Sequence, residues 1–296
     1  MRYLGKGKIM DQWIRKTDAA DHMKEVTNNG VTYLTFPALD ATGIVTHAFS
    51  TRMGGVSESW YSTMNFSFTR GDNREHVLEN YSRMAAALGV KREKMVLTWQ
   101  THTTNIRVVS EDDLGKGVVK ERDYRDIDGL LTNMPGVTLV TFFADCVPLY
   151  FVDPKHRAIG LAHSGWRGTV NRMGEKMVAA MKREYGSRPE DLVCCVGPSI
   201  CSDCYEVGED VVARDEVRLR EVEHDEVGVH AELKLAALGL APLCARAADR
   251  GHHQRGLRRD SGGVAGLALG HERGGLDLLK KVVVVVGRDR VGSEAD

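Results

Sequence analysis

The side chains best suited to chemistry in this sequence are His102, Cys146 and His163, each at the end of an apolar run. A cysteine at a break in a strand can act as a nucleophile or as a metal ligand. Taken alone, each side chain also has an ordinary structural interpretation, since a small buried cysteine or a capped turn with a surface histidine is common. The residue types therefore permit catalysis or metal binding without selecting either.

His163 has the most informative neighbours. The segment Gly160–Gly168 follows an apolar run and precedes a helical pattern, which predicts a turn from strand to helix at His163. Gly165 and Gly168 allow a tight bend of the backbone and leave room for a ligand. Arg167 offers a fork of donors for phosphate or carboxylate, and the N–H groups that begin the next helix favour an anion. An anion site is one hypothesis for this segment, and a capped turn is the other.

Short motifs in a fixed order extend this pattern over much of the chain. They are Thr51–Ser57 (TRMGGVS), Gln100–His102 (QTH), Ala144–Pro148 (ADCVP), His163–Gly168 (HSGWRG), Gly197–Ile200 (GPSI) and Tyr205–Gly208 (YEVG). Together they resemble the family known as laccase-domain polyphenol oxidase, peptidoglycan editing factor or multifunctional purine nucleoside phosphorylase, over residues from about 43 to about 212. The resemblance implies an α/β fold and a zinc-type site with His102, Cys146 and His163 as ligands.

The chemistry of these side chains agrees with that implication. Two imidazoles and one thiolate suit zinc, although copper is an alternative, and three protein ligands leave a fourth position for water or substrate. A metal there would polarise a substrate oxygen or lower the pKa of a bound water. Asp145, next to Cys146, could orient a ligand or could simply cap a turn.

The reaction that the resemblance implies is phosphorolysis of adenosine, inosine and 5′-methylthioadenosine, with deamination of adenosine to inosine. The partners would then be a small-molecule nucleoside and phosphate. Arg52, just before Gly54 and Gly55, is the first candidate for the phosphate anion, and Arg167 is the second. Either arginine could instead be a structural ion-pair partner. Deamination is familiar chemistry for a His/Cys zinc site, although the H-x-E…P-C-x-x-C signature of zinc deaminases is absent.

Three other functions are considered. Copper-dependent phenol oxidation, as in a laccase, needs many paired histidines, and the 11 histidines include no H-x-H pair. A Cys–His amide hydrolase acting on peptidoglycan precursors would use Cys146 as nucleophile and His163 or His102 as base. A non-enzymatic binding module would follow if an altered C-terminal segment has disabled the site.

Composition limits the class of protein. A chain of 296 residues can bury a large core, and its net charge of −1 argues against an electrostatic nucleic-acid binder. No apolar stretch approaches the ~20 residues of a membrane span, and the first residues lack the apolar core of a signal peptide. Six cysteines without a secretory signal are typical of cytoplasmic thiols. A cytoplasmic enzyme is expected, and the oligomeric state is not indicated.

Strand-like and helix-like segments alternate along the chain. Strands are predicted at 31–36, 44–49, 95–100, 105–109, 127–131, 137–143, 147–152, 158–162 and 192–196, helices at 75–88 and 169–185, and a surface loop at 112–126. This alternation predicts one α/β domain, a layered sandwich of mixed β-sheets covered by helices. The domain is expected over residues 31–213, after an N-terminal extension at 1–30.

The last part of the chain has a different composition. No aromatic residue follows Tyr205, and the sequence becomes rich in arginine, glycine, alanine, valine and leucine. We hypothesise that the reading frame shifts near residue 214, so that residues 214–296 form an atypical, poorly ordered tail. A genuinely divergent tail is the alternative. The main sheet is then expected to lack its last strand, with Val282–Val286 forming no regular element.

Overall fold

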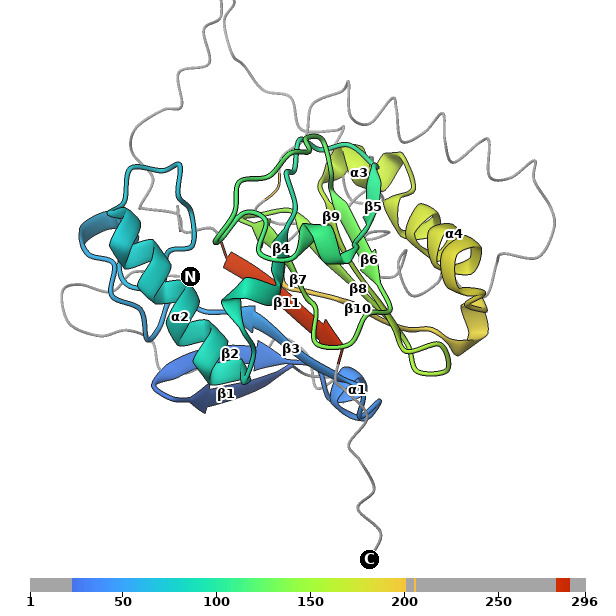
Figure 1. The fold of residues 1–296 in the computed structure, drawn as a ribbon, viewed down its shortest axis with the longest axis horizontal. Helices are drawn as coiled ribbons and strands as arrows, with labels where there is room; N and C mark the ends of the chain where they lie inside the picture. The colour runs from blue at the N-terminus through green and yellow to red at the C-terminus, as the bar shows by residue number, and fades with distance from the viewer. Residues whose placement is uncertain (1–22, 201–204, 206–280, 288–296) are drawn as a thin grey trace, which may run out of the picture.

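Two β-sheets face each other in the computed structural model, which describes residues 23–200, 205 and 281–287 (Figure 1). The strands are β1 (Lys24–Asn28), β2 (Val31–Thr35), β3 (Val45–Ser50), β4 (Met95–Leu97), β5 (Ile106–Val108), β6 (Gly129–Thr132), β7 (Thr138–Phe143), β8 (Val147–Asp153), β9 (Ala158–Ser164), β10 (Val193–Val196) and β11 (Lys281–Gly287). One sheet has the strand order β1-β2-β3-β11-β7-β4, and the other has the order β10-β8-β9-β6-β5. Both sheets mix parallel and antiparallel pairs.

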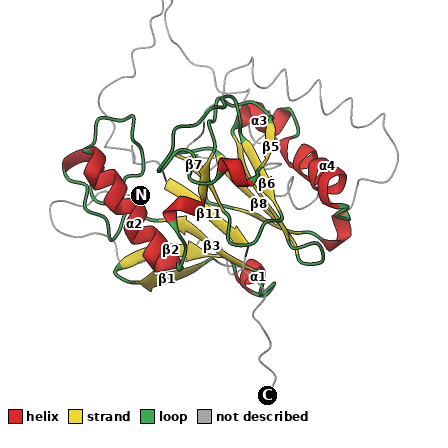
Figure 2. Ribbon diagram, in the orientation of Figure 1, coloured by secondary structure: helices red, strands yellow, loops and turns green. Residues whose placement is uncertain are grey.

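Helices cover the outer faces of the two sheets. The described helices are α1 (Pro37–Asp40), α2 (Arg74–Leu88), α3 (Trp166–Val170) and α4 (Met173–Tyr185), with short 3₁₀ helices η1 (Ser59–Tyr61), η2 (Arg92–Lys94), η3 (Glu111–Asp113) and η4 (Pro189–Asp191). Figure 2 shows α2 and α4, the two long helices, on opposite sides of the strands. The predicted sandwich of mixed sheets covered by helices is therefore confirmed. No helix in the described part of the chain is long and apolar enough to cross a membrane.

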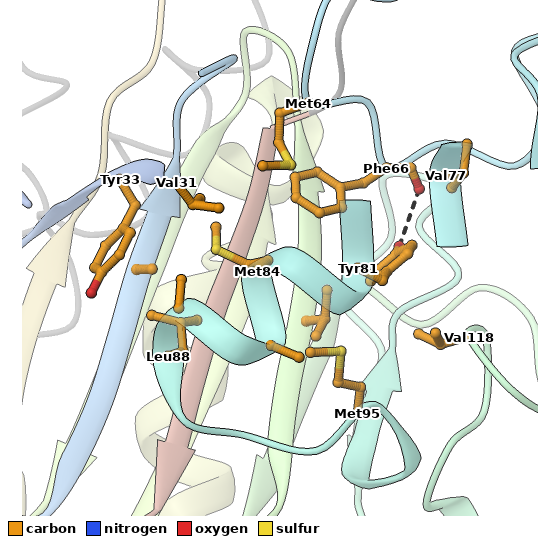
Figure 3. Close-up of a cluster of buried hydrophobic side chains, with 14 of the residues drawn as sticks. Val31, Tyr33, Met64, Phe66, Val77, Tyr81, Met84, Leu88, Met95 and Val118 are labelled. Atoms are coloured by element: carbon orange, nitrogen blue, oxygen red, sulfur yellow. Dashed lines mark hydrogen bonds between the residues drawn. The ribbon is translucent and has the colours of Figure 1, made fainter. Parts of the chain in front are cut away.

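The helix α2 packs on the six-stranded sheet through one apolar stripe. Its ends carry ordinary signals, because the Asn73 side chain accepts a hydrogen bond from the N–H of Glu75 and Gly89 takes a left-handed conformation after the last turn. Between these ends, buried side chains recur at helical spacing and meet residues of the sheet (Figure 3). The hydroxyl of Tyr81 donates to the carbonyl of Phe66 at 3.1 Å, so its polar end is satisfied inside this cluster.

Strand alternation divides the rest of the core into two layers. In β8, Leu149 and Phe151 point toward α4, whereas Tyr150 and Val152 point toward the six-stranded sheet. The layer between the sheets and the layer under α4 are both almost fully closed to solvent. Because the two faces of β8 meet different partners, a slip by one residue would exchange the side chains that face α4 with those that face the other sheet, so the register is firmly specified.

The direction of the strands brings several connections to one edge of the sandwich. The strand β11 runs antiparallel to both β3 and β7, and β4 runs parallel to β7. Phe49 of β3 and Thr141 of β7 both pair with Val283, so β3 and β7 end at nearly the same level. The chain then crosses from β7 to β8, and from β4 to β5, and in both cases passes from one sheet to the other. Residues in these crossings are gathered at a common edge.

The predicted elements agree with the structure except in a few places. The helix predicted at residues 169–185 is two helices, α3 and α4, because Arg172 adopts a left-handed conformation with φ 58° between them. The loop predicted at 112–126 is irregular but is not simply a surface loop, since Asp113 is fully buried within it. Two strands, β1 and β11, were missed.

The strand β11 corrects the expectation for the C-terminal segment. Residues 281–287 do not lie apart from the sheet but pair on both sides, with β3 and with β7, in its interior. Five consecutive valines are β-branched and favour extended backbone, a signal that the unusual composition around them concealed. The expectation of a missing last strand was wrong. The rest of the predicted tail lies outside the described residues, and the shifted reading frame stays a prediction.

The N-terminal boundary also needs correction. The strand β1 lies within the extension predicted at residues 1–30, yet all five of its residues pair with β2. Its side chains are mostly exposed, which is why no apolar pattern indicated a strand. Residues 24–28 therefore belong to the sheet, and residues 1–22 lie outside the described part.

Asp113 ties down the connection that follows β5. Its carboxylate accepts hydrogen bonds from the Arg107 guanidinium at 2.7 and 3.0 Å and from the Lys116 ammonium at 2.9 Å. The backbone N–H of Ser110 donates to the same group. Burial alone would raise the pKa of Asp113, but these donors outweigh it and lower the pKa from 3.8 to about 2. The charged carboxylate therefore stabilises the folded state.

The first prediction concerns acid stability. Because the folded-state pKa of Asp113 is depressed, its contribution is complete above about pH 4 and is lost as pH falls toward about 2. Asp113→Asn should cost roughly 3 kcal/mol at neutral pH, because it removes the buried carboxylate that Arg107 and Lys116 share. It should also reduce the loss of unfolding free energy as the pH falls, because the variant has no carboxylate to protonate at this position. Urea unfolding across this pH range measures both effects. Asp123→Asn is the control, since Asp123 is an exposed second partner of Lys116. Identical acid profiles for wild type and Asp113→Asn would contradict the prediction.

The second prediction concerns β11. A chain that ends at residue 280 leaves the facing edges of β3 and β7 without their shared partner, so it should lose more than about 3 kcal/mol of stability or aggregate through those edges. A chain that ends at residue 287 keeps the strand and is the matched control. Soluble yield and thermal unfolding of the two chains give the comparison. Equal stability of the two would show that the pairing of β11 contributes little.

Candidate metal centre

His102, Cys146 and His163 come together at the edge where the chain crosses between the sheets. One possible donor atom from each lies within 4.8 Å of the others, although 44 and 17 residues separate them in sequence. Within the described residues this is the one such group of histidine, cysteine and acidic side chains. The predicted convergence is confirmed. Exposure increases from buried His163 through half-buried Cys146 to exposed His102, so the site opens toward solvent on one side.

His163 is the innermost of the three. It is the penultimate residue of β9, so the turn predicted at His163 begins after Ser164 instead, and it lies on the face that looks toward the other sheet. Its ring is 5% exposed, and its Nδ1 lies 2.8 Å from Oδ1 of Asp128. An ionised carboxylate only accepts hydrogen bonds, so Nδ1 carries the proton, and in the neutral ring Nε2 keeps a lone pair for a metal.

Asp128 is ionised for a clear reason. Burial alone would raise its pKa, but hydrogen bonds from His163, Thr103 and Thr101 outweigh burial and lower the pKa. Asp128 was not among the predicted site residues. The signal available was one carboxylate inside an otherwise apolar strand-like run, because such a group must find donors when it is buried.

His102 lies in the crossing from β4 to β5. Its backbone is left-handed, with φ 65°, a conformation that few residues other than glycine adopt. Its Nε2 is 3.9 Å from Sγ of Cys146, and its ring meets the His163 ring edge to face with centroids 5.0 Å apart. The two imidazoles are therefore neighbours rather than separate features of the surface.

Cys146 lies in the three-residue crossing from β7 to β8, where the strand break was predicted. Burial raises the pKa of its thiol to about 11, and the negative charges of Asp145 and Asp128 add to that rise. A bound cation would act in the opposite direction, because coordination to a metal deprotonates a thiol.

Gly165 has no space for a side chain. A Cβ atom at this position would lie 2.9 Å from Sγ of Cys146 and 2.9 Å from Cδ2 of His102. Gly165 has φ −75°, which any residue can adopt, so glycine is required here by space alone. The predicted role of Gly165, leaving room at the site, is supported by this close approach.

The two arginines proposed for the anion are differently placed. The guanidinium of Arg52 donates to the carbonyl of Ser62, and Arg52 follows β3 at the same edge of the sheet as the end of β7. Arg167 is exposed in the first turn of α3, and its guanidinium lies 4.5 Å from the centre of the Trp166 ring. Their roles toward an anion stay predictions.

Two residues near Cys146 have positions that differ from the sequence-based expectation or were not part of it. Asp145 is exposed, and the carboxylate found on a histidine is that of Asp128, so the guess that Asp145 orients a ligand is not supported. Tyr205 lies close to the site: burial raises its pKa, the charges of Cys146 and Asp145 add to the rise, and Arg167 opposes it. Tyr205 had been noted only as part of a motif.

The donor set and its spacing fit a metal ion. Bonds of about 2.0 Å to nitrogen and about 2.3 Å to sulfur place two donors of a tetrahedral zinc roughly 3.5 Å apart. The Cys146–His102 distance is 3.9 Å, and since all three donors lie within 4.8 Å of one another, a contraction of at most about 1.3 Å brings them to that spacing. The hydrogen bond from His163 to Asp128 is the kind of support that histidine ligands usually have.

Two named relatives match more than half of this chain. A purine nucleoside phosphorylase of Deinococcus radiodurans is 42% identical over 179 residues, which cover 60% of this chain and 66% of that protein. A protein named adenosine deaminase RL5, from an unknown prokaryotic organism, is 35% identical over 167 residues, which cover 56% of this chain and 63% of that protein. The matched segments thus span just under two thirds of these relatives.

A solved structure and a family model extend the comparison. The crystal structure of YlmD from Geobacillus stearothermophilus superposes with a TM-score of 0.66 at 24% identity, over 91% of this chain and all of that one, which shows a shared fold. The family model described as multi-copper polyphenol oxidoreductase laccase matches residues 46–247, more than half of the chain. The chain belongs to this laccase-type family.

Proposed function

We propose that this protein is a purine nucleoside phosphorylase, acting on adenosine, inosine and 5′-methylthioadenosine, with a metal held by His102, Cys146 and His163. The observation that carries the proposal is the convergence of two imidazoles and one thiol at an edge open to solvent. Three protein donors leave a coordination position for a substrate, unlike a closed structural site. The name of the relative from Deinococcus radiodurans supports the choice of reaction. Zinc suits the donors best, and copper is the second choice.

In phosphorolysis, a phosphate oxygen forms a bond to C1′ of the ribose while the bond from C1′ to the purine nitrogen breaks. The products are the free base and ribose 1-phosphate, or 5-methylthioribose 1-phosphate when the substrate is 5′-methylthioadenosine. A bound metal supplies Lewis acidity at the open position. The phosphate must be held beside C1′, and arginine is suited to this because its fork matches two phosphate oxygens. Arg52, at the edge where β3 and β7 end, is the first candidate for this task. Arg167, whose charge lowers the pKa of Tyr205, is the second.

Deamination of adenosine is a second proposed activity of the same site. Water replaces the amino group on the purine ring, giving inosine and ammonia. The name of the second relative supports it, and a His/Cys metal site is a known setting for this chemistry.

One contact favours a different function. Cys146 Sγ and His102 Nε2 lie 3.9 Å apart, which is close to the arrangement of a nucleophile and its base in a Cys–His amide hydrolase. Such an enzyme, acting on peptidoglycan precursors, would work without metal. Phenol oxidation by copper is a further alternative, suggested by the description of the family. Measuring the metal content together with phosphorolysis and amide hydrolysis separates the phosphorylase from the hydrolase, and the identity of the metal separates both from a copper oxidase.

The third prediction tests the main assignment. Cys146→Ala should reduce phosphate-dependent release of adenine and hypoxanthine by more than about 100-fold and should lower bound metal, because it removes the sulfur ligand. Cys194→Ala is the matched control, since Cys194 is an exposed cysteine in β10. Metal analysis and a nucleoside assay with and without phosphate give the result. Near-normal phosphorolysis in Cys146→Ala would contradict the assignment, and activity that survives metal removal would favour the hydrolase.

The fourth prediction tests the crowding around the site. Gly165→Ala should push Cys146 and His102 apart and lower both metal affinity and phosphorolysis about 10-fold or more, while the metal-free protein stays folded. Gly174→Ala is the control, because its Cβ would lie 3.9 Å from Leu149 and alanine suits the helix α4 better than glycine. The control should melt at the same temperature as wild type or slightly higher. Unchanged metal affinity in Gly165→Ala would show that the site has spare room.

A further inference from the structure

One buried carboxylate connects the two histidines of the site. Asp128 Oδ1 accepts hydrogen bonds from His163 Nδ1 at 2.8 Å and from the backbone N–H of His102 at 3.1 Å. Asp128 Oδ2 accepts from the backbone N–H groups of Thr101 and Thr103, at 3.2 and 2.9 Å, and from the Thr103 hydroxyl at 2.8 Å. Asp128 is 0% exposed, so water does not compete for these positions. Every donor belongs to His163, to His102, or to Thr101 and Thr103 on either side of His102.

The backbone around His102 is shaped to hold this carboxylate. Three successive N–H groups, from residues 101 to 103, point at one anion, which is the arrangement of an anion-binding nest. A nest needs one residue in the left-handed conformation, and His102 is that residue, with φ 65°. A left-handed histidine persists only where its surroundings impose it, and the buried anion of Asp128 imposes it here. The conformation that presents the His102 ring to Cys146 therefore depends on Asp128.

We infer that Asp128 is the positioning residue of the metal centre, setting the tautomer of His163 and the backbone conformation of His102 together. The inference rests on the proposed function for the presence of a metal, but the two effects on the histidines belong to the protein itself. A carboxylate that held only His163 would be an ordinary support for one ligand. Here the same group holds both nitrogen ligands, so neither can move far without disturbing the other.

Asparagine at this position cannot reproduce the arrangement. Oδ1 receives two hydrogen bonds and Oδ2 receives three, so the NH₂ group of an asparagine would face at least two N–H donors in either orientation. One response open to the protein is for His163 to move its proton from Nδ1 to Nε2. The nitrogen that faces the metal would then have no lone pair to offer.

The variant test compares Asp128→Asn with Asp126→Asn in the full chain. Asp126 is an exposed carboxylate two residues away with a left-handed φ of 57° that asparagine tolerates well. Its Oδ1 accepts a hydrogen bond from the Thr101 hydroxyl at 2.6 Å, which the amide oxygen of asparagine also accepts. Asp128→Asn should weaken Zn²⁺ binding about 10- to 100-fold in a chelator competition and should alter the visible spectrum of the Co²⁺-loaded protein. Asp126→Asn should change neither. A folded Asp128→Asn protein with wild-type Zn²⁺ affinity and Co²⁺ spectrum would overturn the inference.

A second measurement needs no variant to fold. Nitrogen NMR of the metal-free wild-type protein, at mildly alkaline pH, should show the proton of His163 on Nδ1. Finding that proton on Nε2 would overturn the inference. These results can be told apart from a failure of the proposed function. If His163 has the expected tautomer and Asp128→Asn loses Zn²⁺ affinity, but the wild-type protein shows no phosphorolysis, then only the phosphorylase assignment is refuted.

Discussion

The burial of an apolar layer between two sheets is the constraint on which the rest of this molecule depends. Both faces of β8 and β9 are closed to solvent and meet different partners, so a slip by one residue would exchange the side chains that face α4 with those that face the other sheet. The connections that cross from sheet to sheet are consequently short and lie at one edge. Polar residues in such crossings are therefore held close together at that edge. Cys146 and His102 meet His163 because the packing of the strands gives their connections a common position.

The sequence was informative where a pattern is periodic and long. The stripe of α2 and the paired runs of β7 and β8 were predicted nearly to the residue, because burial repeats along them. The three donors were found through short motifs and a resemblance, not through periodicity. The break at Arg172 was missed, since a single left-handed residue interrupts a continuous helical pattern. The strand β1 was missed because its exposed side chains do not alternate.

The role of Asp128 illustrates what a sequence cannot show. Its five donors come from residues 25 to 35 positions away, and three of them are backbone N–H groups, which have no sequence signature. Asp145 was the better guess by adjacency, yet adjacency along a chain says little about which carboxylate a buried ring will meet. A buried charge must be surrounded by donors, and only the folded chain reveals which donors those are.

The position of β11 has a consequence for how the chain folds. Lys281 pairs with Phe143, 138 residues earlier, and the strand sits between two others rather than at an edge. A ribosome makes β3 and β7 long before it makes their common neighbour, so the six-stranded sheet cannot close until residues 281–287 have been made. Pairings between such distant segments form slowly, and the waiting strands expose unpaired backbone in the meantime. Until β11 is made, the facing edges of β3 and β7 in the nascent chain therefore lack the strand that joins them.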